Sequence, residues 1–522
     1  MLNDTVPEGA RSSDSLSAPR NTVRTALDHG GVLEGTLEGG VAVYRGVRYG
    51  LAPFGALRFK PPVPVPAWTG SRPAFTFAPA SPQAARVPGA SMFGGEDCLA
   101  LNIWAPADAA ASCPVMVWVP GGAYMRGDAA DPVYDGAKFA KNGIVFISVN
   151  YRVGVDGFMS MPGAPANRGL LDQITALRWV QHNIAAFGGD PSRVTVAGGS
   201  AGAGAIACLM GMPCAEGLFD KVILQSPSLA THTATEADVA ANAIAALLAV
   251  PLTREALSAV PLPTLVATLK RLADDPALRR SFGFNTRNFF PIRAVVDGSV
   301  LEAPPLQAMA DAWVMRSRRI SVLVGCNREE MRLYAVPTGA MERTTEADLR
   351  EFTRDVGMTA EMACRYAIDP VTGAGRTPGE TLCAMQSDYF YRTAARSIAK
   401  EASAAGVPAY LYEFDWSSPK CDGRLGAAHG IEIPFVFDQV ATMAGDEITG
   451  PGAPTALAKF MHGSWVRFVK EGCPGWPSHG TASASLMHFD VRCQFSEDHP
   501  HHFFMGRQAS ACTPNMTACE KT

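Results

Sequence analysis

Long apolar runs are absent from this chain of 522 residues. A helix that spans a bilayer needs about 20 consecutive apolar residues. The most apolar helical stretch, residues 240–252, is interrupted by Asn242 and Pro251. The first 21 residues are polar and lack the apolar segment of a secretory signal. The sequence therefore predicts a cytoplasmic protein with no membrane span, whose residues 1–22 form a flexible tail.

Neither sign of charge is in large excess, and the sequence has no block of basic residues. The 45 Lys and Arg residues and the 49 Asp and Glu residues give a formal net charge of −4. A protein that binds nucleic acid through its phosphates shows a basic patch or stripe. We therefore expect no nucleic-acid partner.

Cysteine is sparse, and its spacing matches neither a metal site nor a disulfide framework. The twelve cysteines include no Cys-x-x-Cys pair, which suits a reducing compartment. A histidine-bearing segment, residues 499–502, precedes Cys512 and Cys519, but this spacing fits no common zinc site. We expect a solvated C-terminal tail over residues 506–522 and no bound metal.

The rest of the composition favours one large α/β domain. Hydrophobic residues make up 47% of the chain, ample for a large core. Length alone suits about three domains, and one large sheet with long insertions is equally allowed. Strand-like and helix-like segments alternate, which favours a large, mostly parallel, doubly wound sheet with helical insertions, and we assign residues 23–505 to it. Buried strands are predicted at 115–119, 144–149, 194–197, 221–225, 320–325 and 408–414, helical insertions at 229–290 and 346–406, and a late helix at 457–470.

Two further segments carry local predictions. Apolar residues alternate at Leu99, Leu101 and Ile103, which indicates a half-buried strand within residues 96–106. Further along, apolar residues at helical spacing follow Asn167, whose side chain is suited to cap the start of that helix.

The most informative stretch is Val194–Gly204, where a β-prone segment runs directly into Gly198-Gly-Ser200-Ala-Gly202. This G-x-S-x-G pattern is typical of a nucleophile elbow, a sharp strand-to-helix turn with a strained serine at its tip. Two other interpretations are a glycine-rich turn with an idle serine and a dinucleotide loop at Gly202–Ala207. The dinucleotide loop would lie inside the predicted helix, away from the strand end. A base, an acid and an oxyanion hole elsewhere in the chain would exclude the idle serine.

Candidates for the acid and the base follow two later strands. Glu330 and His429 each come after a predicted strand, with Glu329 as a competing choice of acid. Because the carboxyl ends of parallel strands meet at one edge of a sheet, we expect Ser200, Glu330 and His429 to form a catalytic triad. Their chain order is that of α/β-hydrolases. His429 would take the serine proton, and Glu330 would hold the imidazole tautomer and stabilise the imidazolium.

A glycine-rich turn, residues 120–124, follows the predicted strand at 115–119. Such a turn exposes backbone amides, which an oxyanion hole requires, although the same glycines also suit a plain turn. We expect the amides of Gly122, Ala123 and Ala201 to form the oxyanion hole.

Several segments carry a likeness to a known family: Glu96–Pro106, Asn150–Gly154, Phe187–Pro191, Gly198–Gly202, Val296–Gly298, Gly325–Glu330 and His429–Gly430. On these segments the chain resembles the type-B carboxylesterases, the family of bacterial para-nitrobenzyl esterases, animal carboxylesterases and cholinesterases. The likeness runs from about residue 23 to about residue 504, and the family's triad and oxyanion amides fall on the residues named above. The resemblance implies an α/β-hydrolase fold. It also implies serine esterase activity without a cofactor, on a small-molecule ester, in a monomer or homodimer.

The chain departs from the family pattern beside the catalytic positions. Gly199 stands where the family usually has Glu before the nucleophile, and Met331 where it has Gly after the acid. Pro120 replaces the His that usually opens the oxyanion turn. No cysteine precedes Cys98, so the disulfide of secreted members cannot form, in agreement with a reducing compartment.

The expected activity is hydrolysis of neutral aryl or alkyl carboxylic esters through an acyl-enzyme. Gly199 brings no negative charge to the approach to Ser200, and we expect Tyr124 and Gly199 to contact the substrate. A carbamate or amide hydrolase on the same triad is the alternative activity. A non-catalytic binding protein on the same fold, as in the adhesion branch of the family, is a hypothesis from another class, and the intact triad argues against it.

Overall fold

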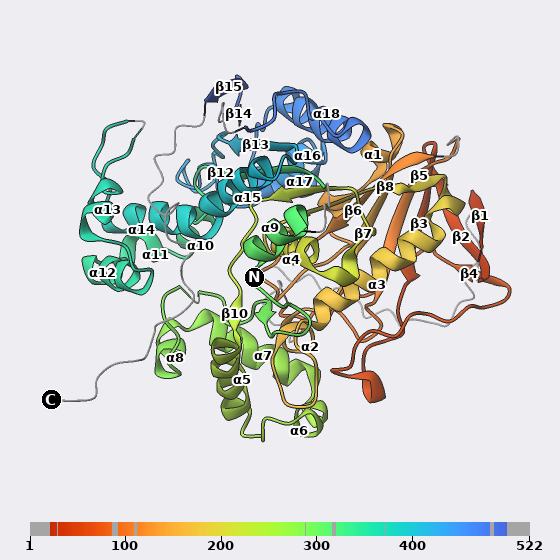
Figure 1. The fold of residues 1–522 in the computed structure, drawn as a ribbon, viewed down its shortest axis with the longest axis horizontal. Helices are drawn as coiled ribbons and strands as arrows, with labels where there is room; N and C mark the ends of the chain where they lie inside the picture. The colour runs from red at the N-terminus through yellow and green to blue at the C-terminus, as the bar shows by residue number, and fades with distance from the viewer. Residues whose placement is uncertain are drawn as a thin grey trace, which may run out of the picture.

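A computed structural model describes most of the chain (Figure 1). The predicted C-terminal tail, the histidines and cysteines of residues 499–519 and the first 20 residues of the predicted N-terminal tail lie outside the described residues. The described residues are 21–28, 30–85, 92–108, 112–287, 289–315, 320–370, 372–480 and 485–497.

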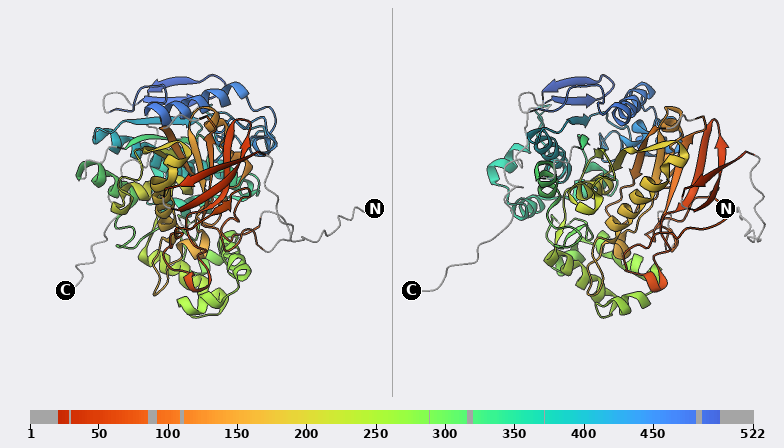
Figure 2. Two further views of the ribbon diagram at one scale, coloured as in Figure 1. Left: turned by 90° about the vertical axis from the view of Figure 1, so that its right-hand side faces the viewer. Right: turned by 45° about the vertical axis from the view of Figure 1, so that its right-hand side comes forward.

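One large sheet organises the described residues, and Figure 2 shows its twist, with β1 to β4 at one end and the β14–β15 hairpin at the other. Thirteen strands form it in the order β1-β2-β3-β5-β7-β6-β8-β9-β12-β13-β14-β15, with β4 paired to β2. The strands from β7 to β14 run parallel, and antiparallel strands extend both ends. The expected α/β sheet is therefore confirmed, with antiparallel additions. The strands are β1 Thr22–Leu27, β2 Gly30–Glu38, β3 Val41–Arg48, β4 Ser71–Pro73, β5 Ala100–Pro106, β6 Cys113–Val119, β7 Val145–Val149, β8 Gly189–Gly199, β9 Lys221–Gln225, β12 Ser321–Asn327, β13 Ala409–Phe414, β14 Ser485–Phe489 and β15 Gln494–Glu497, and a separate pair is β10 His232–Thr233 with β11 Val295–Val296.

Helices cover both faces of this sheet, and two helical groups, α5 to α8 and α10 to α14, lie beyond it (Figure 1). A π-helical segment, Asp388–Arg392, joins α14 to α15. Among the residues that the structure describes, no helix has both the length and the apolar character needed to cross a membrane. The helices are α1 Ala137–Lys141, α2 Gly154–Phe158, α3 Arg168–Asn183, α4 Ala201–Gly211, α5 Ala234–Leu248, α6 Arg254–Ala259, α7 Leu262–Asp274, α8 Pro276–Ser281, α9 Pro305–Met315, α10 Arg332–Ala335, α11 Ala340–Arg343, α12 Glu346–Asp355, α13 Ala360–Arg365, α14 Pro378–Ser387, α15 Thr393–Ala404, α16 Ile433–Val436, α17 Met443–Thr449 and α18 Thr455–Glu471.

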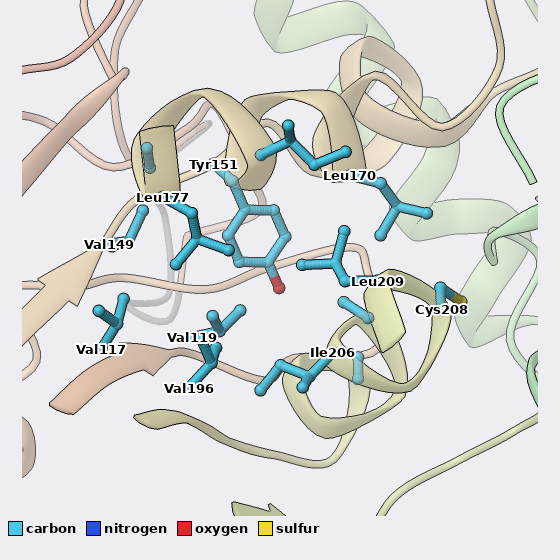
Figure 3. Close-up of a cluster of buried hydrophobic side chains, with 14 of the residues drawn as sticks. Val117, Val119, Val149, Tyr151, Leu170, Leu177, Val196, Ile206, Cys208 and Leu209 are labelled. Atoms are coloured by element: carbon cyan, nitrogen blue, oxygen red, sulfur yellow. The ribbon is translucent and has the colours of Figure 1, made fainter. Parts of the chain in front are cut away.

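The central strands are buried on both faces because both of their side-chain rows are apolar. On β6, Val117 belongs to the core under α3 and α4, and its neighbour Trp118 belongs to the core under α1 and α18. Figure 3 shows the first of these cores, where Leu170 and Leu177 of α3 meet side chains of α4 and the sheet. Tyr151 lies in the middle of this cluster, and its hydroxyl donates a 2.7 Å hydrogen bond to the backbone oxygen of Pro120. The core thereby holds the loop after β6.

Strand β5 differs from its prediction, because it is buried on both faces instead of one. Leu101 and Ile103 pack into the core on one face of the sheet, and Trp104 packs into the core on the other face, so neither face meets solvent. The polar residue on the second face, Asn102, is buried and satisfied: it accepts from the Gly46 amide at 2.9 Å and donates to Ser148 Oγ at 3.0 Å. The alternation at Leu101 and Ile103 therefore marked one apolar face, and the opposite face is also buried, with Asn102 between Ala100 and Trp104.

Asn167 also differs from its prediction, because its side chain does not cap α3. Its backbone is left-handed at φ 56°, and its side chain turns to β11. There Oδ1 accepts from the Val295 amide at 2.8 Å, and Nδ2 donates to the Val295 oxygen at 2.7 Å. A tertiary partner takes the hydrogen-bonding capacity that a local cap would have used.

Candidate active site

Ser200 lies at the turn from β8 into α4, as the elbow motif predicts. Its backbone adopts φ 58° and ψ −124°, a strained region for a residue with a side chain. Its amide donates to the Gln225 oxygen at 2.8 Å, which ties the turn to the end of β9. Although Ser200 precedes the first helical residue, its side chain makes no capping hydrogen bond. The hydroxyl is therefore not committed to holding the helix.

Glycine at position 202 lets the first turn of α4 approach the end of β6. A Cβ at this position would lie 2.2 Å from the Val119 oxygen and 2.9 Å from the Pro120 oxygen. Only a residue without a Cβ fits against these two carbonyl groups. The motif glycine thus sets the distance between the serine turn and the loop after β6.

His429 and Glu330 are hydrogen bonded in the interior of the protein. Nδ1 of His429 lies 2.5 Å from Oε2 of Glu330, and the Glu330 side chain is fully buried. The second oxygen of Glu330 accepts from the Asn327 amide at 2.8 Å, so both oxygens of the carboxylate have partners. This arrangement directs the other ring nitrogen of His429 away from the acid, where it is available to a hydroxyl.

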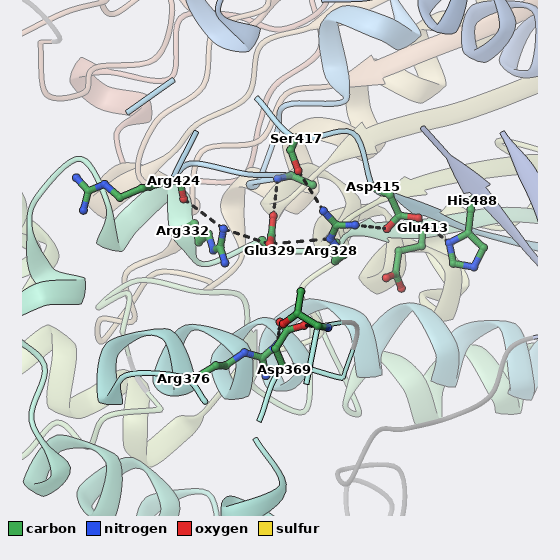
Figure 4. A network of polar contacts seen from close by, with 12 residues as sticks. Arg328, Glu329, Arg332, Asp369, Arg376, Glu413, Asp415, Ser417, Arg424 and His488 are labelled. Atoms are coloured by element: carbon green, nitrogen blue, oxygen red, sulfur yellow. Dashed lines mark hydrogen bonds and ion pairs between the residues drawn. The ribbon is translucent and has the colours of Figure 1, made fainter. Parts of the chain in front are cut away.

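Glu329, the competing acid, faces a different network (Figure 4). Its carboxylate lies 3.1 Å from Arg332 Nη1 and accepts from the Ala427 amide at 2.8 Å. Figure 4 shows it beside Arg328 and Arg332, in a polar network that includes Asp415 and His488. The geometry therefore favours Glu330 as the partner of His429.

A second buried glutamate, which the sequence analysis missed, supports this pair. Glu432 accepts from Asn327 Nδ2 at 2.6 Å and from Gln225 Nε2 at 3.1 Å. Burial, and then the charge of Glu330, raise the pKa of Glu432 above its ordinary value. Glu432 lies three residues after His429 and Asn327 three before Glu330, a spacing that could have flagged both as neighbours of the pair.

Ser200 and His429 are brought together by neighbours that share one side chain. A Cβ at Gly199 would lie 3.6 Å from Cδ1 of Ile433, and a Cβ at Gly430 would lie 3.8 Å from the same atom. The residue before the serine and the residue after the histidine therefore pack on one methyl group. The strand register brings the acid to the same edge of the sheet. Gly199 on β8 lies opposite Gln225 on β9, and Gln225 lies opposite Gly325 on β12, the strand that precedes Glu330.

Two of the amides expected in the oxyanion hole, those of Gly122 and Ala123, lie in the loop after β6, and the third, that of Ala201, begins α4. A Cβ at Gly121 would lie 3.0 Å from the Ser200 Cβ, so the loop directly adjoins the serine. The backbone amides of Gly122, Ala123 and Ala201 donate to no acceptor among the described residues. Unused donors beside a candidate nucleophile are what stabilisation of an oxyanion requires.

The backbone of this loop is strained, and backbone hydrogen bonds hold it in that conformation. Ala123 and Tyr124 both have φ 58°, and Gly122 has φ 126°. The Gly122 oxygen accepts from the Met125 and Arg126 amides at 3.0 Å each. Tyr124 itself is buried, with its ring 4.6 Å from that of Phe158. The structure thus places Tyr124 behind the loop, and contact of Tyr124 with a substrate stays a prediction.

Aromatic rings cover His429. The Tyr391 ring lies 4.5 Å and the Tyr334 ring 5.9 Å from the imidazole, centroid to centroid. Phe289 and Phe290 both contact Tyr334 edge-on, at 5.7 Å and 5.6 Å. Burial raises the pKa of Tyr334 to about 12, so its hydroxyl stays neutral near pH 7. These rings, none of which the sequence analysis singled out, form an apolar wall at the site.

A cavity of 330 Å³ lies beyond this wall, between α8 and the helices α11, α12 and α14. Phe289 belongs both to its lining and to the ring cluster on Tyr334. Arg279 also lines it and donates to the backbone oxygens of Leu272 and Ala273. Phe289 and Tyr334 therefore link the lining of this cavity to the imidazole of His429.

The electrostatic setting of His429 predicts a pH dependence. Burial lowers the pKa of His429, but the charge and hydrogen bond of Glu330 outweigh burial and hold the pKa above its ordinary value of 6.5. A general base must be neutral, so kcat/KM for an uncharged ester should fall as the pH drops through this raised pKa. We expect the acidic limb of the pH profile to have an apparent pKa above 6.5, measured at constant ionic strength. A limb centred below 6.5 would contradict this electrostatic assignment.

The sheet carries a serine turn, a buried acid–histidine pair and unused backbone amides. This combination defines an α/β-hydrolase. The sequence profile of the carboxylesterase family matches residues 19–500, and the chain belongs to this family. It is a carboxylic ester hydrolase.

Known proteins agree with this assignment. The chain is 33% identical to phenmedipham hydrolase of Pseudarthrobacter oxydans, over 86% of this chain and 91% of that protein. It is 32% identical to para-nitrobenzyl esterase of Bacillus subtilis, over 90% of this chain and 95% of that protein. A crystal structure of a carboxylesterase from Geobacillus stearothermophilus superposes with a TM-score of 0.78 at 31% identity, covering 91% of this chain and 98% of that one.

Proposed function

We propose that the protein hydrolyses carboxylic esters through an acyl-enzyme on Ser200. In the first half-reaction His429 takes the hydroxyl proton as Oγ attacks the ester carbonyl carbon, and then gives that proton to the departing alcohol. In the second half-reaction a water molecule loses a proton to His429 and attacks the acyl-enzyme. The carboxylic acid leaves, and Ser200 regains its proton.

The hydrogen bond of His429 Nδ1 to the buried Glu330, at the same sheet edge as the strained Ser200, is the observation that carries this proposal. Glu330 would hold the imidazole tautomer and stabilise the imidazolium in both half-reactions. The amides of Gly122, Ala123 and Ala201 would bind the negative oxygen of each tetrahedral intermediate.

A carbamate or amide hydrolase on the same triad is the second candidate function. The relative named phenmedipham hydrolase, 33% identical to this chain, is one reason to test it. The three substrate classes differ in reactivity. Compared with an aryl ester, an anilide has a poorer leaving group, and an aryl carbamate has a less electrophilic carbonyl carbon. Hydrolysis of a matched aryl ester, aryl carbamate and anilide should rank the ester first in kcat/KM. A carbamate or anilide in first place would replace the esterase assignment.

The residue before the nucleophile bears on the charge of the substrate. Position 199 carries no side chain, and a Cβ there would meet Ile433 and Trp118 only at ordinary contact distances. A carboxylate several ångströms from a quaternary ammonium group contributes about 1–4 kcal/mol, depending on the effective dielectric. Without this carboxylate, the preference for cationic over neutral esters should be weaker by about tenfold or more than in relatives that have Glu at this position. We propose that the enzyme does not select cationic esters and accepts neutral aryl and alkyl esters.

The test compares kcat/KM for an acylcholine with that for its uncharged dimethylbutyl analogue. We expect parity or a preference for the neutral ester, and a partial shift toward the choline ester in Gly199→Glu. A Cβ at position 199 would meet only the side chains of Ile433 and Trp118, at ordinary contact distances. A clear preference of the wild-type enzyme for the choline ester would show that another acidic group supplies the missing charge.

Location and assembly remain proposals. The thiols of Cys98, Cys208 and Cys326 are buried and unpaired, which supports a reducing, cytoplasmic compartment. The formal net charge of −4 gives no support to a nucleic-acid partner. We propose a monomer or homodimer, which light scattering of the purified protein would distinguish.

A further inference from the structure

Arg293 is a buried cation without an anionic partner. Its side chain is 5% exposed. Among the described residues, its guanidinium makes a single hydrogen bond, from Nη2 to the backbone oxygen of Arg287 at 2.8 Å, and no ion pair. Its Cζ lies 5.9 Å from the centroid of the Phe390 ring. A buried charge is costly unless an opposite charge or several hydrogen bonds compensate it.

Four other buried arginines show what full compensation looks like in this protein. Arg168 donates to four backbone oxygens. Arg58, Arg152 and Arg392 each form an ion pair with a buried aspartate. Burial lowers the pKa of Arg293 below its ordinary value, as expected of a guanidinium without a compensating anion. With one hydrogen bond and no ion pair among the described residues, Arg293 is therefore less compensated than these four arginines.

The carboxylate of Glu236 does not fill this role. Its charge reaches Arg293, but Glu236 is paired with Arg287 at 2.6 Å. It also accepts from the Thr233 amide at 3.0 Å as part of the cap of α5. Among the described residues, Arg293 is therefore left without a carboxylate of its own.

Arg293 lies beside the catalytic groups. Its charge acts on Tyr124, which follows the oxyanion amide of Ala123, and on Tyr391, whose ring packs on His429. The π-helical segment Asp388–Arg392 presents both the ring on the imidazole and the ring on the guanidinium. Through the adjacent rings of Phe390 and Tyr391, Arg293 is therefore linked by direct packing to the imidazole of His429.

A second unpartnered polar group adjoins the guanidinium. His232 is 1% exposed, and its Nε2 has no hydrogen-bond partner. Burial, and then the charge of Arg293, lower the pKa of His232 to about 3, so the imidazole is neutral near pH 7. A neutral imidazole can donate one hydrogen bond. The His232 amide donates to the oxygen of Ala294, the residue after Arg293, at 2.8 Å, so the imidazole and the guanidinium come from neighbouring backbone. A cation and a free donor from neighbouring backbone match the needs of a carboxylate.

We propose that the preferred substrates are esters whose acyl part carries a second carboxylate, bound at Arg293 and His232. The hydrolysis then releases an alcohol and a dicarboxylic or polycarboxylic acid. The inference rests on the proposed esterase function and adds a preference within it, since neutral esters remain substrates.

The acyl side is favoured because of where Arg293 lies. The alcohol must leave for solvent before water attacks the acyl-enzyme, whereas the acyl group stays on Ser200 through both half-reactions. A deeply buried group such as Arg293 suits the part of the substrate that is retained. Binding energy from this contact would hold the acyl-enzyme carbonyl against the oxyanion amides.

The test uses the half-ester 4-nitrophenyl adipate and the neutral 4-nitrophenyl hexanoate, which have acyl chains of equal length. Spontaneous hydrolysis is subtracted, and kcat/KM is measured near pH 7.5, where the free carboxyl is ionised. We expect the wild-type enzyme to prefer the adipate ester by roughly tenfold or more. Arg293→Gln should lower the adipate-to-hexanoate ratio at least tenfold, and Arg293→Lys should retain part of it.

Arg279→Gln is the matched control, because Arg279 is also a buried arginine but donates only to backbone oxygens beside the neighbouring cavity. We expect it to leave the ratio at the wild-type value. A wild-type ratio of one or less, or equal losses on both esters in Arg293→Gln, would overturn the inference while leaving the esterase function intact. Absence of hydrolysis of the neutral ester would count against the esterase function itself.

A measurement on the wild-type enzyme covers the case in which Arg293→Gln does not fold. Adipate should inhibit hydrolysis of the neutral ester competitively and more strongly than hexanoate at equal concentration. The same or weaker inhibition by adipate would contradict a carboxylate site at Arg293.

Discussion

Replacement of Ser200 by Ala should lower ester turnover by about 10⁴- to 10⁶-fold, because the nucleophile is lost and only binding and oxyanion stabilisation remain. The fold should be unaffected. Serine and alanine both carry a Cβ, so the cost of φ 58° at this position is the same in both proteins. The Ser200 side chain makes no capping bond whose loss would destabilise α4. The measurement is kcat for a neutral aryl ester beside the free energy of unfolding.

Ser226→Ala is the matched control. Ser226 lies directly after β9, is buried, has φ 47°, and its hydroxyl has no hydrogen-bond partner. Removal of an unpaired buried hydroxyl should cost little stability, and activity should stay within a few-fold of wild type. Near-normal turnover in Ser200→Ala, or a comparable collapse in both variants, would contradict the role of Ser200.

The second large effect is expected at Glu330. Glu330→Gln keeps the size of the side chain and an oxygen for the Asn327 amide, but removes the charge beside His429 Nδ1. The glutamine can also favour the wrong imidazole tautomer. We expect kcat to fall by about 10³- to 10⁴-fold.

Glu329→Gln provides the comparison at the adjacent position. It weakens a partly exposed ion pair with Arg332, and such pairs contribute only about 0–1 kcal/mol. Activity should therefore stay within a few-fold of wild type. Equal effects of the two substitutions, or a larger one at Glu329, would reject Glu330 as the acid.

The main parts of the site were predictable because each is a local motif at a strand end. The elbow around Ser200 requires glycine on both sides, and this requirement is visible in the sequence. Glu330 and His429 follow other strands, and the rules for parallel sheets place those ends at one edge. Residue pattern alone left Glu329 and Glu330 open, and the family resemblance selected Glu330. The geometry agrees, because Glu330 bonds His429 while Glu329 bonds the Ala427 amide.

The partners of these groups were not predictable from local pattern. The side chains of Asn102 and Asn167 bond to strands distant in the sequence. The predictions of a half-buried strand around Asn102 and of a helix cap at Asn167 were therefore wrong. The network of Glu432 and Asn327 depends on two loops meeting in space. Arg293 is informative because no described residue gives it an anionic partner, and such an absence is visible only in three dimensions.

The central claim is that Ser200 is the nucleophile of an esterase, and covalent labelling tests it most directly. The purified protein is treated with an organophosphate, and the adduct is counted by intact mass and located by peptide mapping. The account predicts one adduct per chain, on Ser200, formed at the rate at which esterase activity is lost. An adduct on another residue, or loss of activity without labelling of Ser200, would contradict it.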